Sequence, residues 1–216
     1  VGPNFKWIKD EINKVNILQL VLLIISLIFS YFFVKKNGVN YLFALPLFAL
    51  SIFLFIYTVK ELFSKKTNIS QKISHFGFSL FILSVLLNGV LAKEFSTNMK
   101  VGEEIKFMNK FVKFENLKIS TKDNYQTLIA DFKIKDQKKI INLNPEIRIY
   151  DQPQTITSEA DISSNLLSDN FIVFNIINDD GFYNVRYQIK PFMIWIWISV
   201  ILLSLGGFLS LIKKND

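Results

Sequence analysis

Cysteine is absent from this 216-residue sequence, and histidine occurs only once, at position 75. Without cysteine the chain has no disulfide, no thiolate metal site and no cysteine nucleophile. A serine–histidine–carboxylate triad would require His75 as its base, and zinc would require more imidazole or thiolate than this chain contains. Phosphate-cradling loops of the G-x-G-x-x-G type are also missing. The sequence therefore predicts no self-contained active site and no catalytic residue.

Charged residues are nearly absent from four long apolar runs, which span residues 17–34, 41–59, 73–92 and 192–212. Each run has about the 20 residues that an α-helix needs to cross a hydrocarbon core of about 30 Å. With 50% hydrophobic residues overall, the chain is predicted to be an α-helical membrane protein with four transmembrane helices. The runs contain no acidic residue, and His75 is their one ionisable side chain, which disfavours a transporter.

The distribution of lysine predicts the orientation in the membrane. Residues 93–190 contain 14 basic and 14 acidic residues, so the net charge of +7 lies beside the helices, which disfavours nucleic-acid binding. Lysines gather in the N-terminal tail, in residues 60–72 and at the C-terminal end. The positive-inside rule assigns these segments to the cytoplasmic or matrix side and residues 93–190 to the outer side. We expect a bacterial inner (plasma) membrane with this domain in the periplasm, or alternatively the mitochondrial inner membrane.

Residues 93–190 alternate apolar and polar positions, which is typical of strands with one buried face. An Asn-Asp-Asp-Gly sequence at 178–181 is a strong hairpin signal. We expect a mostly β outer domain, a small antiparallel barrel or sandwich, between the three helices of residues 1–92 and the fourth helix and inner tail of residues 191–216. The predicted strands are 104–109, 111–119, 127–135, 139–143, 146–150, 171–177 and 182–189.

The beginning of the chain and its amino-acid usage suggest its origin. It starts Val-Gly-Pro without an initiator methionine, so we expect a fragment of a longer protein. Phenylalanine, isoleucine, asparagine and lysine are frequent and arginine occurs twice, which is typical of AT-rich bacterial or mitochondrial genomes.

His75 is the candidate functional residue, because an ionisable group inside a spanning segment is costly to bury. In one interpretation it lies near Lys72 and extends to the lipid headgroups. In the other it binds a metal, since a buried imidazole with no protein acid nearby suits haem iron. The chain has no second histidine, so a bis-histidine site would need another part of the protein or another subunit.

Seven short motifs follow one another along the chain: GP with W and D in 2–10, HFGF at 75–78, MKVGE at 99–103, PEIRIY at 145–150, SEADI at 158–162, VRYQIKPFMIWIW at 185–197 and LGG at 205–207. In this order they resemble the C-terminal part of the CcmF family, the haem lyase subunit of the cytochrome c maturation pathway. The resemblance covers essentially the whole chain.

The resemblance implies that His75 is one axial ligand of the iron of a b-type haem held within the membrane. It also implies a share in reducing and attaching haem, with the haem chaperone CcmE, a CcmH-type subunit and apocytochrome c as partners beside membrane lipid. This fragment alone is expected to be inactive. The alternative hypothesis is a haem-free, membrane-anchored scaffold for an assembly complex, in which His75 is a buried or snorkelling side chain that binds no metal.

Several other motif residues are interpreted structurally. Lys190, Trp195 and Trp197 are expected to anchor the re-entry into the membrane at the lipid interface. Gly206 and Gly207 are expected to be helix-packing positions.

Overall fold

The computed structural model describes residues 17–65, 67–136, 139–177 and 181–213. Several features of the sequence analysis lie outside the described residues. They are the motif and the lysines of the N-terminal tail, Lys66, Lys214 and the first three residues of the predicted 178–181 turn. The chain divides into two compact units. The helical unit comprises Val1–Leu86 and Ile198–Asp216, and the β unit comprises Leu87–Trp197.

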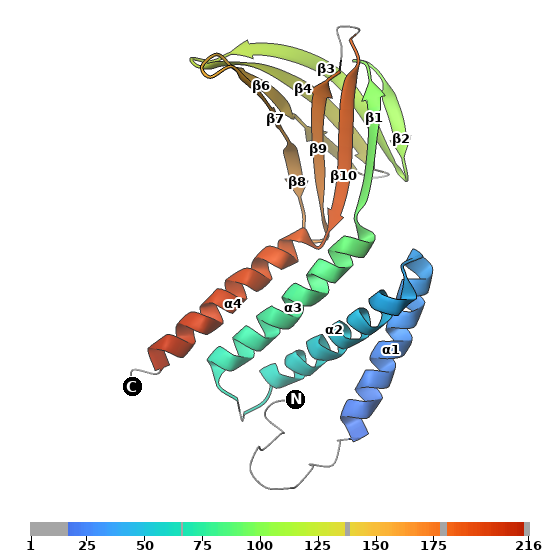
Figure 1. Ribbon diagram of the computed structural model, residues 1–216, viewed down its shortest axis with the longest axis vertical. Coiled ribbons are helices and arrows are strands. Elements are labelled where there is room, and N and C mark those ends of the chain that lie inside the picture. The colour runs from blue at the N-terminus through green and yellow to red at the C-terminus, as the bar shows by residue number, and fades with distance from the viewer. Residues whose placement is uncertain (1–16, 66, 137–138, 178–180, 214–216) are drawn as a thin grey trace. The chain divides into compact units, whose positions relative to one another are not determined.

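Four helices, drawn as coiled ribbons in Figure 1, confirm the predicted transmembrane helices. All four are long and apolar enough to cross a membrane. Asn40 caps the second helix, because its side-chain oxygen accepts a hydrogen bond of 3.0 Å from the backbone N–H of Leu42. The helices are α1 (Ile17–Asn37), α2 (Tyr41–Leu62), α3 (Ile69–Leu91) and α4 (Met193–Lys213).

Small hydroxyl side chains, rather than large apolar ones, fill much of the interior of the helical unit. The Thr58 and Ser79 hydroxyls lie 2.6 Å apart between α2 and α3, and Ser70 donates a hydrogen bond of 2.8 Å to the Gly206 carbonyl of α4. Many large apolar residues face outward instead, as do Phe29 and Phe43, although Phe48 is buried. This arrangement suits lipid as the solvent, where small and polar residues mediate helix contacts. The buried hydroxyl residues are Ser26, Ser30, Ser51, Thr58, Ser70, Ser79, Ser84 and Ser199.

Two glycines allow α3 and α4 to approach closely. A Cβ atom on Gly77 would lie 3.0 Å from Leu202 Cβ, and one on Gly206 would lie 2.8 Å from the backbone nitrogen of Ser74. The packing role predicted for Gly206 is therefore confirmed. The same role predicted for Gly207 is wrong, because a Cβ there would meet nothing within 4 Å.

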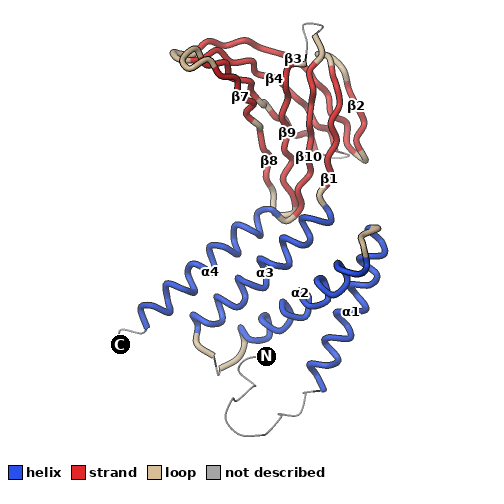
Figure 2. The backbone as a smooth tube through the Cα atoms, in the orientation of Figure 1, coloured by secondary structure: helices blue, strands red, loops and turns tan. Residues whose placement is uncertain are grey.

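The β unit is an antiparallel sandwich of two sheets, shown in red in Figure 2. One sheet has the order β1-β10-β9-β8, and the other β2-β3-β4-β6-β7 with β5 paired to β4. The strands are β1 (Lys93–Met99), β2 (Glu104–Phe107), β3 (Lys110–Thr121), β4 (Tyr125–Asp136), β5 (Lys139–Leu143), β6 (Glu146–Tyr150), β7 (Thr155–Glu159), β8 (Asp161–Ser164), β9 (Ser168–Ile176) and β10 (Tyr183–Pro191).

The core of the β unit lies between the two sheets, where the alternate residues of the strands meet. Phe114 of β3 stacks on Phe132 of β4 with 4.5 Å between ring centroids, and both rings contact Phe174 of β9 edge-on at 6.3 Å. All three side chains are almost fully buried. Apolar burial from both sheets thus stabilises the sandwich.

All seven predicted strands are present, and three further strands lie at sheet edges. β1 and β8 flank the first sheet, and β7 ends the second. The sequences of β7 and β8, TITSE and DISS, contain no buried residue and show only weak alternation, whereas KEFSTNM of β1 begins with two exposed residues and alternates only from Phe95 to the buried Met99. The prediction missed them for this reason.

Candidate functional site

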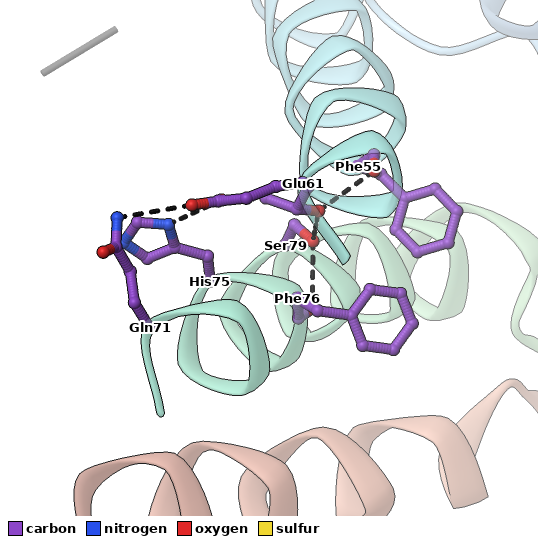
Figure 3. A network of polar contacts seen from close by, with 7 residues as sticks. Phe55, Glu61, Gln71, His75, Phe76 and Ser79 are labelled. Carbon is purple, nitrogen blue, oxygen red and sulfur yellow. Dashed lines mark hydrogen bonds and ion pairs between the residues drawn. The ribbon is translucent and has the colours of Figure 1, made fainter. Parts of the chain in front are cut away.

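His75 lies in the second turn of α3, where its imidazole contacts a carboxylate of α2 (Figure 3). The Nδ1 atom is 2.8 Å from Oε2 of Glu61, and the other carboxylate oxygen accepts a bond of 3.3 Å from Gln71 Nε2. The Glu61 side chain is 8% exposed, whereas that of His75 is 46% exposed. The result is a buried carboxylate that holds a partly exposed ring.

The geometry of the α2–α3 pair produces this contact. Glu61 occupies the last turn of α2, and Gln71 and His75 are four residues apart on α3, so their side chains lie on the same face of the helix. The Thr58–Ser79 contact joins the two helices one turn further into the bundle. Local helix periodicity therefore directs both α3 side chains toward Glu61.

The expectation that no protein acid lies near His75 is wrong. Helix α2 extends to Leu62, past the apolar run that was predicted to end at residue 59, and thereby brings Glu61 into a spanning helix. The sequence contained a signal: Glu61 is followed by Leu62 and Phe63, and no proline or glycine ends the helix before them. The argument against a transporter from an absence of acidic residues loses its basis as well.

The hydrogen bond to Glu61 determines which ring nitrogen is available to a ligand. A carboxylate accepts hydrogen bonds, so Nδ1 donates, and in the neutral ring Nε2 then carries the lone pair. Metal-binding histidines commonly donate their second nitrogen to a carboxylate in this way, which fixes the tautomer and the orientation of the ring. The arrangement fits an imidazole that binds a metal through Nε2.

A cavity of about 620 Å³ adjoins His75 on the side of α3 and α4. Its walls carry mostly small or polar side chains, which include Ser70, Gln71 and Ser74. Within the described part of the chain, no three histidine, aspartate or glutamate side chains gather in a way that would hold a metal ion. Haem iron is a metal that fits a single imidazole, because the porphyrin supplies its four equatorial ligands.

The predicted interface residues lie where β10 meets α4. Lys190 Nζ lies 4.8 Å from the centre of the Phe171 ring, and Trp197 is 62% exposed. The Trp195 indole N–H donates a hydrogen bond of 2.8 Å to the Leu166 carbonyl, a contact that sequence reasoning did not anticipate. These residues lie far along the chain from His75 and form no part of its contacts.

Fold and site together define a class: a polytopic membrane protein with an antiparallel β-sandwich between its third and fourth helices and one imidazole held by a buried carboxylate. Residues 90–191 match the family model "CcmF C-terminal beta-sandwich". These matches and those below confirm the resemblance: the chain is similar to the C-terminal part of CcmF-type cytochrome c biogenesis proteins.

Relatives and a solved structure extend the similarity to the helices. The cytochrome c-type biogenesis protein CcmF of Haemophilus influenzae is 23% identical over 100% of the chain, and that of Escherichia coli K12 is 25% identical over 98%. The chain covers 36% and 34% of these two relatives. The solved structure titled cytochrome c heme lyase CcmF has the same fold over 94% of the chain and 35% of its own, with a TM-score of 0.68 and 15% identity. The chain thus spans about a third of these proteins.

Proposed function

We propose that this chain contributes one axial haem ligand, His75, to a CcmF-type cytochrome c haem lyase subunit. The observation that supports this most directly is the 2.8 Å contact between His75 Nδ1 and Glu61, which leaves Nε2 for iron. In this proposal Glu61 is a positioning residue, because it acts on the iron only through the imidazole.

The residues around His75 suit a haem b in three respects. Glu61 holds the ring in one orientation, the apolar outer faces of the helices keep water away, and the polar wall of the cavity offers donors such as Ser74 and Gln71. A haem bound there supplies one-electron redox chemistry. The chain has no second histidine, so a bis-histidine site would take its other ligand from another part of the protein or from another subunit.

The whole protein, in this proposal, helps to reduce haem that the chaperone CcmE delivers and to attach it to apocytochrome c, together with a CcmH-type subunit. The β unit serves as a docking or bracing module in the periplasm, or in the intermembrane space of a mitochondrion. Lys65 in the α2–α3 connection, with Lys60 at the end of α2 and Lys72 at the start of α3, supports an inner location for that loop.

Spectra of the purified full-length protein test the haem assignment. We expect a six-coordinate, low-spin b-type haem that becomes five-coordinate or is lost in His75→Ala, as optical and resonance Raman spectra would record. Phe78→Ala is the matched control, because Phe78 is on the same helix and is 51% exposed. An unchanged spectrum in His75→Ala would refute the assignment, and the absence of haem from both proteins would favour the scaffold.

Accessibility to a reagent that does not cross membranes tests the proposed orientation. A cysteine at Lys65 should react only in inverted vesicles, and one at Glu103 in the β unit only in intact, right-side-out cells or spheroplasts. The parent protein reports any labelling at other positions. The opposite pattern would overturn the proposed topology.

A further inference from the structure

Two adjacent leucines are exposed in the turn between β8 and β9. Leu166 and Leu167 have 63% and 69% of their surface exposed. Such neighbouring apolar side chains in a hairpin turn, where polar residues are usual, suggest contact with an apolar phase.

Hydrogen bonds fix this turn beside the first turn of α4. The Trp195 indole donates to the Leu166 carbonyl at 2.8 Å, and the backbone N–H of Phe192 donates to the Leu167 carbonyl at 2.9 Å. Within the turn, the Asn165 side-chain oxygen accepts from the backbone N–H groups of Leu167 at 2.8 Å and Ser168 at 3.0 Å. The backbone of the turn is therefore held at both of its leucines.

The junction between β10 and α4 is shaped for this contact. Phe192 has a φ of 60°, in the left-handed region that bulky residues rarely adopt. Such a conformation persists where surrounding contacts determine it, and here the Phe192 N–H reaches the turn. Immediately before it, Pro191 pairs with Ser168, the first residue of β9.

We propose that the β8–β9 turn is a lipid-binding element whose two leucines enter the headgroup and acyl boundary of the bilayer beside α4. The depth follows from Trp195, which belongs to the first turn of an apolar spanning helix and whose indole suits the membrane interface. Because both hydrogen bonds tie the turn to this level, Leu166 and Leu167 lie where α4 enters the apolar phase. Lys190, one residue before Pro191, supplies a cation for anionic headgroups.

This inference is independent of the haem proposal, because it uses no residue near His75. Burial of two leucine side chains in lipid favours membrane contact through the hydrophobic effect, and the turn is pre-formed by hydrogen bonds. In this proposal the turn holds the start of β9 at the membrane surface. The end of β10, which pairs with the start of β9, is already linked covalently to α4.

Single-cysteine variants of the full-length protein test this inference. Leu166→Cys and Leu167→Cys are labelled with an environment-sensitive fluorophore in lipid nanodiscs, and Ile176→Cys is the control at the opposite end of β9. Ile176 is 46% exposed and pairs with Tyr183, whereas the turn end of β9 pairs with Pro191. The parent protein, treated with the same fluorophore, reports any labelling of other thiols.

We expect both turn probes to be quenched by lipids with acyl-chain nitroxides and to be several-fold less sensitive to aqueous iodide than the Ile176 probe. Trp195→Phe in the Leu167→Cys background should raise the iodide sensitivity, because the indole hydrogen bond is lost. Equal iodide quenching at the turn and at Ile176 would overturn the proposal. Protection that appears only in native membranes with partner proteins, and not in nanodiscs, would also overturn it in favour of a protein partner.

Discussion

Glu61→Gln is the sharpest perturbation of the proposed site, because it removes one charge and preserves the shape of the side chain. His75 Nδ1 would then donate to a neutral amide oxygen instead of a carboxylate 2.8 Å away. Hydrogen bonds to charged groups contribute about 1.5–3 kcal/mol and neutral ones about 0.5–1.5 kcal/mol, so the loss is about 1–1.5 kcal/mol. The loss should destabilise the ferric haem more than the ferrous haem, because a carboxylate partner increases the electron donation of the imidazole to the iron.

The expected result is a shift of the haem midpoint potential to more positive values. For a one-electron couple, a tenfold change in equilibrium corresponds to about 59 mV, so the shift should be about 40–65 mV. Loss of a carboxylate that orients a metal-binding histidine also lowers metal affinity by about 10- to 100-fold. Spectroelectrochemical titration of the full-length protein measures the potential, and a pyridine haemochrome assay measures the haem content.

Glu103→Gln is the matched control, because it makes the same chemical change at an exposed carboxylate of the β unit. A Glu61→Gln potential within about 10 mV of the parent, in a protein that loses its haem on His75→Ala, would refute the role given to Glu61. If the haem were unaltered in both Glu61→Gln and His75→Ala, His75 would be refuted as the ligand as well. The failure of the role given to Glu61 and the failure of the haem assignment are therefore distinguishable.

Two further predictions concern stability. Gly206→Val should destabilise the helical unit by about 1–3 kcal/mol, because its Cβ would meet the backbone of Ser74. Gly207→Val should leave the thermal unfolding midpoint in detergent unchanged, because a Cβ there meets nothing within 4 Å. Equal shifts of the midpoint in the two variants would contradict the packing described. In the β unit, a hydrogen bond from Arg186 lowers the pKa of Glu94 below 4.5, so their pairing stabilises the fold above that pH and its effect is lost as the pH falls through the lowered pKa. The stability difference between parent and Arg186→Gln, followed by fluorescence during denaturant unfolding, should therefore be present at pH 6 and shrink under acid; a difference independent of pH would contradict this.

The apolar runs and the alternating strands were predictable because each reflects a single local rule. A spanning helix must satisfy its backbone within lipid over about 20 residues, and a half-buried strand must alternate its side chains. The strongly alternating β3 and β4 contribute residues such as Phe114 and Phe132 to the core and were found from the sequence. The edge strands β7 and β8 were missed, because pairing with a neighbour, rather than a buried alternating face, makes them strands; β1 was missed because its alternation covers only Phe95 to Met99.

The candidate site was half predictable for a comparable reason. His75 stands out as the one histidine of the chain and lies inside an apolar run. Glu61 lies in a segment whose charge suggested a loop, and its role depends on the approach of α2 to α3 through Thr58 and Ser79. That approach arises from small side chains in the bundle, which composition alone does not specify.

The pairing of β1 with β10 makes the β unit an insertion whose two ends are neighbours, since Lys93 pairs with Ile189 in the antiparallel register. The strand that follows α3 therefore runs directly against the strand that precedes α4 (Figure 1). Tension that draws the ends of α3 and α4 apart would break the β1–β10 hydrogen bonds one after another, beginning with the Lys93–Ile189 pair. The first strand to separate mechanically would be β1, and the remaining strands of its sheet would stay joined to the core.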